Sequence, residues 1–331
     1  MSENKGVLVY CEAAGGKLTP MATELLGAGS RLAAALGEEL NAVLIGSGVS
    51  DFAQEAIAYG AQKVYLVEEP FLKDYSTEPY LMALEEVVRQ VAPEIILLGQ
   101  TATGRDLAPW LAFHLNTGAT MDCTALEIDP ASQRLLMTRP VYGGNALAVQ
   151  VCEFNPQIAT VRAKAMAPLA KDSTRQGQVI KVAVGIEPAA IKTRVIERKM
   201  EAAAGVKLEE ARVVVSGGRG MGSTDGFKQL AEIAGVLKGA VGATRPPCDK
   251  KWIADTQQIG LTGKVVSPDL YIAVGLSGAS QHVSGFSSAK VIVAINKDPE
   301  ANIFKVAHYG IVADWKAVLP AFTAKLKEVA G

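Results

Sequence analysis

The feature that most constrains this fold is a regular alternation of short apolar runs with longer amphipathic segments. The runs carry no charge and are about as long as a strand that is buried on both faces of a sheet. In the first third of the chain they fall at residues 7–9, 42–45, 64–67 and 95–98. Segments with helical periodicity lie between and after them, at residues 21–36, 52–59, 80–91 and 107–115. This alternation predicts a parallel, doubly wound sheet.

The pattern changes after Asn116 and again near residue 188. Residues 135–138, 146–152 and 158–161 are strand-like and separated by proline and glycine, so we expect an antiparallel extension of the first domain. Residues 188–212 are rich in charge, which is typical of a linker. A second α/β unit follows, with strands expected at 213–215, 240–242, 270–274 and 291–295 and helices at 227–237 and 315–329.

These patterns define the expected domain organisation. The sequence predicts an α/β fold with two doubly wound Rossmann-like domains, of which the second has a parallel sheet and holds a cofactor. We expect the first domain at residues 1–190, a charged linker at 191–210 and the second domain at 211–331.

Composition excludes several classes of partner. The 33 basic and 34 acidic residues give a formal net charge of -1, so there is no electrostatic reason to expect nucleic acid or an anionic membrane as partner. The four cysteines are far apart and form no Cys-x-x-Cys pair, which indicates a reducing compartment without a metal site or disulfide framework. We expect no signal peptide before the first strand, and no apolar stretch reaches the ~20 residues of a membrane span. We therefore expect a cytoplasmic location.

A glycine-rich loop follows the first apolar run of the second unit. Residues 216–222 are Ser-Gly-Gly-Arg-Gly-Met-Gly, and a predicted helix follows. Glycine lets the backbone approach a pyrophosphate, and arginine can contact phosphate through two N–H groups. The spacing is not that of the dinucleotide fingerprint, so a simple tight turn and an NAD- or nucleotide-binding enzyme stay open as alternatives. The candidate phosphate contacts are Gly218, Arg219 and Gly220.

Two further polar clusters lie in the same unit. Thr244 and Arg245 follow the strand predicted at 240–242. An arginine at the end of a strand is more often a surface charge than a ligand, so Arg245 becomes a candidate only beside the other clusters. A polar loop between apolar segments supplies Gln258, Gly260, Leu261, Thr262 and Gly263.

The densest cluster follows the apolar strand 270–274. The pattern Gly275-x-Ser277-x-Ala279 is close to a nucleophile elbow, which makes a serine hydrolase that uses Ser277 a rival function. A triad in the usual order needs an acid and then a histidine after the serine, whereas Asp314 follows both histidines of this region. His282 could equally cap or pack the start of a helix. The candidates here are Ser277, Gly278, Ala279, Ser280, Gln281 and His282.

Asn296 and Asp314 complete the set, each at or just beyond the end of a predicted apolar strand. Alone, they are typical turn residues. All these clusters, however, fall near the carboxyl ends of strands in one domain, where a doubly wound sheet holds its ligand. The convergence favours a large cofactor.

The sequence resembles the alpha subunit of electron transfer flavoproteins. The resemblance is carried by residues 270–285, 294–300 and 309–314, which are similar to a long and specific signature of that family. It extends over essentially the whole chain, and residues 104–107 and 142–146 match family patterns in the first domain. The resemblance implies one FAD extended across the C-terminal domain and a beta subunit that docks on the first domain.

The resemblance also implies roles for individual residues. Arg219 and its loop lie beside the cofactor, Thr244 and Arg245 flank the isoalloxazine, and Thr262 lies near flavin N5. Residues 277–282 hold the pyrophosphate and the N1/C2=O edge, Asn296 contacts the adenosine side, and Asp314 closes the adenine pocket. Reduction by one electron puts negative charge on the N1/C2=O edge, and a nearby cation or helix N-terminus stabilises it. We expect Arg245 and His282 to stabilise this charge.

The function implied is that of an electron carrier rather than a stand-alone enzyme. The heterodimer would pass single electrons from flavoprotein dehydrogenases, such as acyl-CoA dehydrogenase, to a quinone reductase or ferredoxin. Some members of the family bifurcate electrons from NADH with a second FAD in the beta subunit, whereas others bind AMP there, and this chain does not decide between them. Leu261 departs from the glutamine that the family commonly has, which puts the usual flavin potential in doubt.

Overall fold

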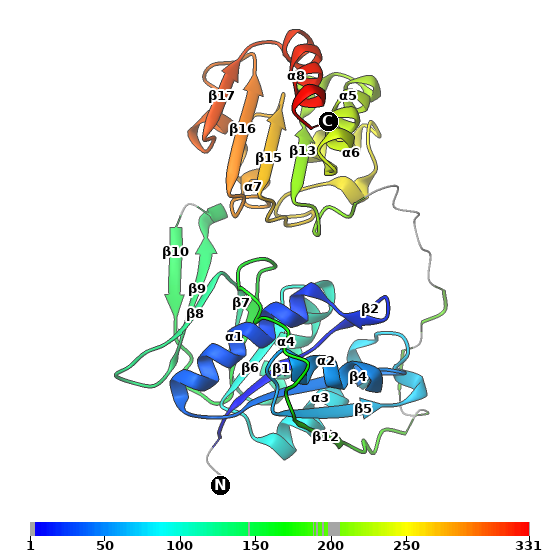
Figure 1. Cartoon of the computed structure of the whole chain (residues 1–331), viewed down its shortest axis with the longest axis vertical. Helices are drawn as coiled ribbons and strands as arrows, with labels where there is room; N and C mark the ends of the chain where they lie inside the picture. Colours follow the sequence, from blue (N-terminus) through cyan, green and yellow to red (C-terminus); the bar gives the residue numbers. More distant parts are fainter. Residues whose placement is uncertain are drawn as a thin grey trace. The chain divides into compact units, whose positions relative to one another are not determined.

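The computed structural model describes residues 4–144, 146–187, 189, 191–193, 195–197 and 206–330. Its contacts divide the chain into two compact units, one of Met1–Val141 with Leu147–Lys199 and the other of Tyr142–Ala146 with Met200–Gly331 (Figure 1). Much of the linker predicted at 191–210 lies outside the described residues, as does residue 145 of the family pattern at 142–146. Among the described helices, none is long and apolar enough to cross a membrane.

The first unit is built on a seven-stranded sheet in the order β12-β5-β4-β1-β6-β11-β7, in which all neighbouring strands are parallel. The central strands are buried on both faces, as their uncharged sequences predict. The strands are β1 (Val7–Tyr10), β4 (Leu40–Gly46), β5 (Lys63–Glu68), β6 (Ile95–Gly99), β7 (Ala119–Cys123), β11 (Gln157–Val161) and β12 (Gln178–Lys181).

Helices cover both faces of this sheet. Val7 and Val9 of β1 belong to the apolar core beneath α1 and α2, whereas Leu8 and Tyr10 belong to the core beneath α3 and α4. This alternation follows from the period of two along a strand. The helices are α1 (Pro20–Leu36), α2 (Ala53–Ala58), α3 (Thr77–Val91) and α4 (Ala102–His114).

The structure corrects one expectation about the middle of the chain. The predicted antiparallel extension exists as a three-stranded sheet of β8 (Ala125–Ile128), β9 (Leu135–Val141) and β10 (Ala146–Gln150), in the order β10-β9-β8. Residues 158–161 are not part of it. They lie in β11, which inserts into the first parallel sheet between β6 and β7. All five residues of β11 are buried, and only the interior of the sheet offers apolar neighbours on both faces.

The second unit contains a five-stranded sheet in the order β14-β13-β15-β16-β17, and every neighbouring pair is parallel. The chain moves from β13 to β14 on one side and then crosses to β15 on the other, so the strand order reverses between β13 and β15. The strands are β13 (Val213–Gly217), β14 (Ala240–Ala243), β15 (Leu270–Val274), β16 (Val291–Asn296) and β17 (Tyr309–Val312).

The two faces of this second sheet are covered differently. The longer helices α5 and α8 pack on one face, and the other carries Ile259, Phe286, Ile303 and Leu208. The two-domain α/β architecture predicted from the sequence is confirmed. The helices are α5 (Thr224–Val236), α6 (Arg245–Asp249), α7 (Ser280–Val283) and α8 (Trp315–Ala330).

Short elements complete the described part of the chain. A small antiparallel hairpin is formed by β2 (Ala13–Ala14) and β3 (Lys17–Leu18). The short 3-10 helices are η1 (Ser50–Phe52), η2 (Pro70–Leu72), η3 (Tyr142–Gly144), η5 (Arg219–Met221), η6 (Asp255–Gln257) and η7 (Asn302–Lys305).

Candidate functional site

The predicted site residues gather at the carboxyl edge of the second sheet. Because its five strands are parallel, all of them end at this edge. The glycine loop follows β13, Thr244 follows β14, the 277–282 cluster follows β15, Asn296 ends β16, and Asp314 follows β17. The loop 258–263 reaches the same edge through a bridge between Gln258 and Ala243 at the end of β14. The strand reversal between β13 and β15 lies at the middle of this edge, where doubly wound sheets bind ligands.

Glycines allow the loops after β13 and β15 to touch. The backbone N–H of Gly220 donates to the carbonyl of Gly275 at 2.9 Å. A Cβ on Gly218 would lie 2.4 Å from that same carbonyl oxygen, and Gly275 has a φ of 59°. These glycines are therefore explained by loop packing, which is the turn alternative considered for the sequence. Arg219, between them, is exposed and available to a ligand.

The loop after β15 presents a run of free backbone donors. Among the described residues, no acceptor pairs with the N–H groups of residues 276–281. The other side of the loop is held in place, since the Asn296 amide donates to the carbonyl of Leu276 at 2.8 Å and the N–H of Ile303 donates to the carbonyl of Ser277 at 3.0 Å. Gly278 has a φ of 79° and leaves no room for a Cβ beside Ile303. A fixed loop with unpaired N–H groups suits an anion such as a pyrophosphate.

The loop 258–263 is attached to α7. The N–H of Leu261 donates to the carbonyl of Gln281 at 2.7 Å, and a Cβ on Gly260 would lie 2.7 Å from that oxygen. The Gln258 amide donates to Oγ1 of Thr262 at 3.0 Å. The side chain of Leu261 is 66% exposed, so it presents an apolar surface beside these polar groups.

His282 is buried, and its hydrogen bonds define its tautomer. Its Nδ1 lies 2.8 Å from the carbonyl of Ile259 and therefore carries the proton, while Nε2 lies 3.0 Å from the hydroxyl of Tyr271 and accepts from it. Burial lowers the pKa of His282 to about 4. The imidazole therefore supplies no fixed positive charge at neutral pH. Its contact with a cofactor stays a prediction.

Arg245 places a positively charged side chain just beyond the end of β14. The N–H of Thr244 donates to the carbonyl of Gly217 at 3.1 Å, which ties this strand end to the glycine loop. Arg245 opens α6, and its Nε lies 3.5 Å from a carboxylate oxygen of Asp249. Its side chain is largely exposed, and a guanidinium keeps its charge at any ordinary pH.

At the end of β17, Asp314 has a local role. Its Oδ1 accepts from the N–H of Lys316 at the start of α8. The neighbouring Trp315 donates its indole N–H to the carbonyl of Gly220 at 2.9 Å and so joins β17 to the glycine loop. Sequence reasoning missed Trp315 because its partner is 95 residues away.

The hydrolase alternative does not fit this geometry. Both ring nitrogens of His282 are engaged, and Nδ1 of His308 accepts from the backbone N–H of Ile292 at 3.0 Å. In the described part of the chain, no hydrogen bond joins Ser277 to a histidine. The hydroxyl of Ser277 therefore lacks the base that a nucleophile requires.

The fold and this edge define an α/β protein that binds a large phosphate-bearing cofactor. The family model of the electron transfer flavoprotein domain matches residues 7–187, and that of the electron transfer flavoprotein FAD-binding domain matches residues 207–287. The chain therefore belongs to the electron transfer flavoprotein alpha subunit family, and its cofactor is FAD.

Relatives of similar length support this assignment. The electron transfer flavoprotein subunit alpha of Thermoanaerobacterium thermosaccharolyticum is 46% identical over 99% of this chain and 100% of its own length. The protein of the same name from Megasphaera elsdenii is 42% identical over 100% of this chain and 99% of its own. Protein FixB of Azorhizobium caulinodans is 42% identical over 96% of this chain and 88% of its own.

Proposed function

We propose that this chain holds FAD along the carboxyl edge of its second sheet and works as a carrier of single electrons. The free N–H groups of residues 276–281 support this proposal most directly, because they suit the pyrophosphate of the cofactor. Arg219 lies in the adjacent loop and would add a charged contact to the same group. The residues that would complete the site are Thr244, Arg245, Gln258, Thr262, Gln281, His282, Asn296 and Asp314.

FAD supplies the electron-accepting ring, and the protein sets how readily that ring takes an electron. Arg245 is the nearby group with a permanent positive charge, and it would stabilise negative charge on the flavin. His282 contributes differently, because its neutral ring holds the backbone of residue 259 against α7. We infer that charge stabilisation comes from Arg245 and backbone N–H groups, while His282 preserves the shape of the site.

As a carrier, the chain would work in a heterodimer with a beta subunit. The first unit exposes apolar side chains on and just beyond β10, including Leu147, Val149 and Val151, and two aromatic ones on α4, Trp110 and Phe113. Exposed apolar groups of this size favour a protein partner. We propose that the beta subunit docks on the first unit. Electrons would come from flavoprotein dehydrogenases such as acyl-CoA dehydrogenase and pass to a quinone reductase or ferredoxin in the cytoplasm.

Replacing Arg219 tests the site. The heterodimer, co-expressed with its beta subunit, should be yellow, and Arg219→Ala should weaken FAD binding about tenfold or more, as loss of a charge-assisted hydrogen bond predicts. Flavin fluorescence during dilution measures the dissociation constant. Arg212→Ala is the matched control, because Arg212 is an exposed arginine just before β13, at the opposite edge of the sheet, where it pairs with Asp269. Colourless wild-type heterodimer, or equal affinity in both variants, would contradict the proposal.

A further inference from the structure

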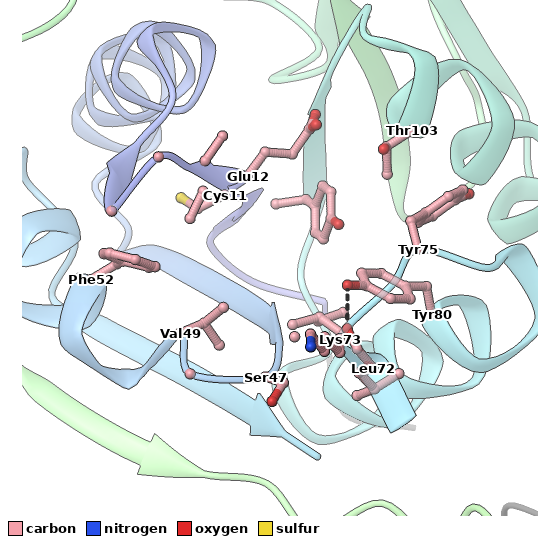
Figure 2. Close-up of a pocket in the computed structure, with 18 residues that line it drawn as sticks. Cys11, Glu12, Ser47, Val49, Phe52, Leu72, Lys73, Tyr75, Tyr80 and Thr103 are labelled. Atoms are coloured by element: carbon pink, nitrogen blue, oxygen red, sulfur yellow. Dashed lines mark hydrogen bonds between the residues drawn. The ribbon is translucent and has the colours of Figure 1, made fainter. Parts of the chain in front are cut away.

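A cavity of about 470 Å³ opens at the carboxyl edge of the first sheet (Figure 2). None of the predicted FAD ligands lines it. It lies over the ends of β1 and β4, and Thr103 at the start of α4 contributes to its wall. The strand order of this sheet reverses between β1 and β6, so the cavity is beside the position where open parallel sheets bind ligands. Its volume is typical of a small-molecule pocket.

One end of the cavity is rich in hydrogen-bond acceptors. Glu12 follows β1, and its Oε1 accepts from the hydroxyl of Thr101 at 2.6 Å. Burial raises the pKa of the Glu12 carboxyl, so a ligand that donates to it would recover part of the cost of its charge. The hydroxyl protons of Tyr75 and Tyr80 are already donated, to Asp106 and to the carbonyl of Leu72. Their oxygens can therefore only accept from a ligand.

Two carboxylates lie at or beside the cavity and disfavour a phosphate group there. The backbone N–H groups of Val49 and Ser50, in the turn after β4, both donate to Oε1 of Glu68, at 3.0 and 3.3 Å. A carboxylate of the chain thus already occupies two backbone donors of this turn. Glu12 adds a second acidic group, and Lys73 is the one basic residue in the wall. The chemistry favours an uncharged ligand that carries hydroxyl groups.

The opposite part of the wall is apolar. Val49 and Phe52 lie across the cavity from Thr103 (Figure 2), and Ile45 and Leu72 also line it. The glycines of the turns between β2 and β3 and after β4 have open space where a Cβ would stand, so a flat ring can approach the backbone there.

We propose that this cavity binds an unphosphorylated nucleoside. The two neighbouring ribose hydroxyls would donate to the Glu12 carboxylate, and the base would pack against Val49 and Phe52. A carboxylate has two acceptor oxygens and so matches a vicinal diol, as acidic residues do at the ribose of dinucleotides. This site is separate from the proposed FAD function and does not depend on it.

Calorimetric titration of the purified heterodimer with adenosine tests the proposal. We expect saturable binding that Glu12→Gln weakens about tenfold or more, because a charged hydrogen-bond acceptor is lost. Glu24→Gln is the matched control: Glu24 is also a buried carboxyl, but it lies on α1 and accepts from the N–H of Lys164 outside the cavity. FAD content should be equal in all three proteins, which separates this test from that of the FAD site.

Two further ligands, each compared between wild type and Glu12→Gln, test the two contacts separately. The binding that Glu12→Gln weakens should be about tenfold or more weaker for 2′,3′-dideoxyadenosine than for adenosine, and no tighter for AMP than for adenosine. Restricting the comparison to Glu12-dependent binding excludes a nucleotide held by the beta subunit. Absence of Glu12-dependent adenosine binding overturns the proposal. Equal binding of the dideoxy compound would contradict hydrogen bonds between the ribose hydroxyls and Glu12. Tighter binding of AMP or inorganic phosphate to this site would contradict the claim that the Glu68 carboxylate disfavours phosphate.

Discussion

Replacing Tyr271 by phenylalanine isolates the role of one buried hydroxyl. Tyr271 lies on β15 with 0% exposure, and its ring stacks on Phe286 with 3.9 Å between centroids. The hydroxyl lies 3.0 Å from Nε2 of His282. Tyr271→Phe keeps the ring and its stack and removes only the donor to His282.

The expected cost follows from burial. Nε2 of His282 would keep its lone pair in the interior without a donor, and a buried unsatisfied acceptor costs about 1–3 kcal/mol. In a domain of this size that loss lowers the melting temperature by roughly 4–12 °C. Because His282 also binds the carbonyl of Ile259, part of the loss should appear as easier opening of the loop 258–263. Each 1.4 kcal/mol of easier opening speeds amide exchange about tenfold.

Hydrogen exchange at the Leu261 amide reports this effect directly, because that N–H donates to the carbonyl of Gln281. We expect faster exchange at Leu261 in Tyr271→Phe and a lower melting temperature of the second unit. Tyr309→Phe is the matched control, since Tyr309 lies on β17 of the same sheet and is 67% exposed. Unchanged exchange and melting in Tyr271→Phe would refute the claim that the Tyr271 hydroxyl holds His282 and its loop.

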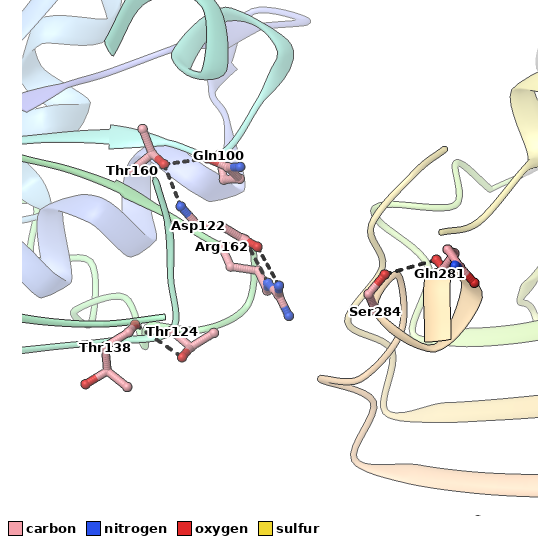
Figure 3. A network of polar contacts seen from close by, with 8 residues as sticks. All are labelled: Gln100, Asp122, Thr124, Thr138, Thr160, Arg162, Gln281 and Ser284. Carbon is pink, nitrogen blue, oxygen red and sulfur yellow. Dashed lines mark hydrogen bonds and ion pairs between the residues drawn. The ribbon is translucent and has the colours of Figure 1, made fainter. Parts of the chain in front are cut away.

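Two further predictions concern buried charge. The pKa of His282 is about 4 in the folded chain against 6.5 for a free histidine, so the unfolded state takes up its proton first. The contribution of His282 to stability is therefore complete above about pH 6.5 and falls as the pH drops toward 4, by at most about 1.4 kcal/mol per pH unit. His282→Gln should flatten the dependence of the free energy of urea unfolding on pH between about 6.5 and 4. An unaltered slope would show that other groups cause this dependence. In the first unit, Asp122 and Arg162 form a bidentate ion pair with Arg162 5% exposed (Figure 3). Asp122→Asn should cost about 3–5 kcal/mol in urea unfolding, because the Arg162 charge loses its carboxylate while asparagine tolerates the φ of 67° at this position. A loss below about 1 kcal/mol would show that the pair is effectively solvated.

The fold was predictable because the composition of most strands indicates whether they are buried on both faces of a sheet. Residues 95–98 are uncharged and strongly apolar, and β6 is buried on both faces as expected. Strand β11 was assigned to the wrong sheet, although it is equally buried. Its sequence mixes glutamine, alanine and threonine, so its composition did not separate it from the strands before it. Only the pairing with β6 and β7 shows where it belongs.

The site was predictable in its position and less so in its chemistry. Polar clusters after parallel strands predict one common edge, because all parallel strands end on the same side. The neutral state of His282 was not predictable, because it follows from burial of the ring, which lowers its pKa, and its tautomer is set by the carbonyl of Ile259, which is 23 residues away in sequence. The sequence shows that a histidine can titrate near neutral pH, but its surroundings in the folded chain set its pKa and its tautomer.

Loops at the carboxyl edges of both parallel sheets carry backbone N–H donors. The two edges differ in whether the chain itself already binds those donors. In the second sheet, the N–H groups of residues 276–281 are unpaired among the described residues, and exposed Arg219 and Arg245 follow neighbouring strands. In the first sheet, the N–H groups of Val49 and Ser50 already bind the Glu68 carboxylate. The same fold can therefore offer free donors to a pyrophosphate at one edge and hold part of its donors on an internal carboxylate at the other. Glu68 contributes to that difference, so Glu68→Gln should raise the affinity of the first sheet's edge for inorganic phosphate in calorimetric titration, and an unchanged affinity would show that Glu68 has no part in it.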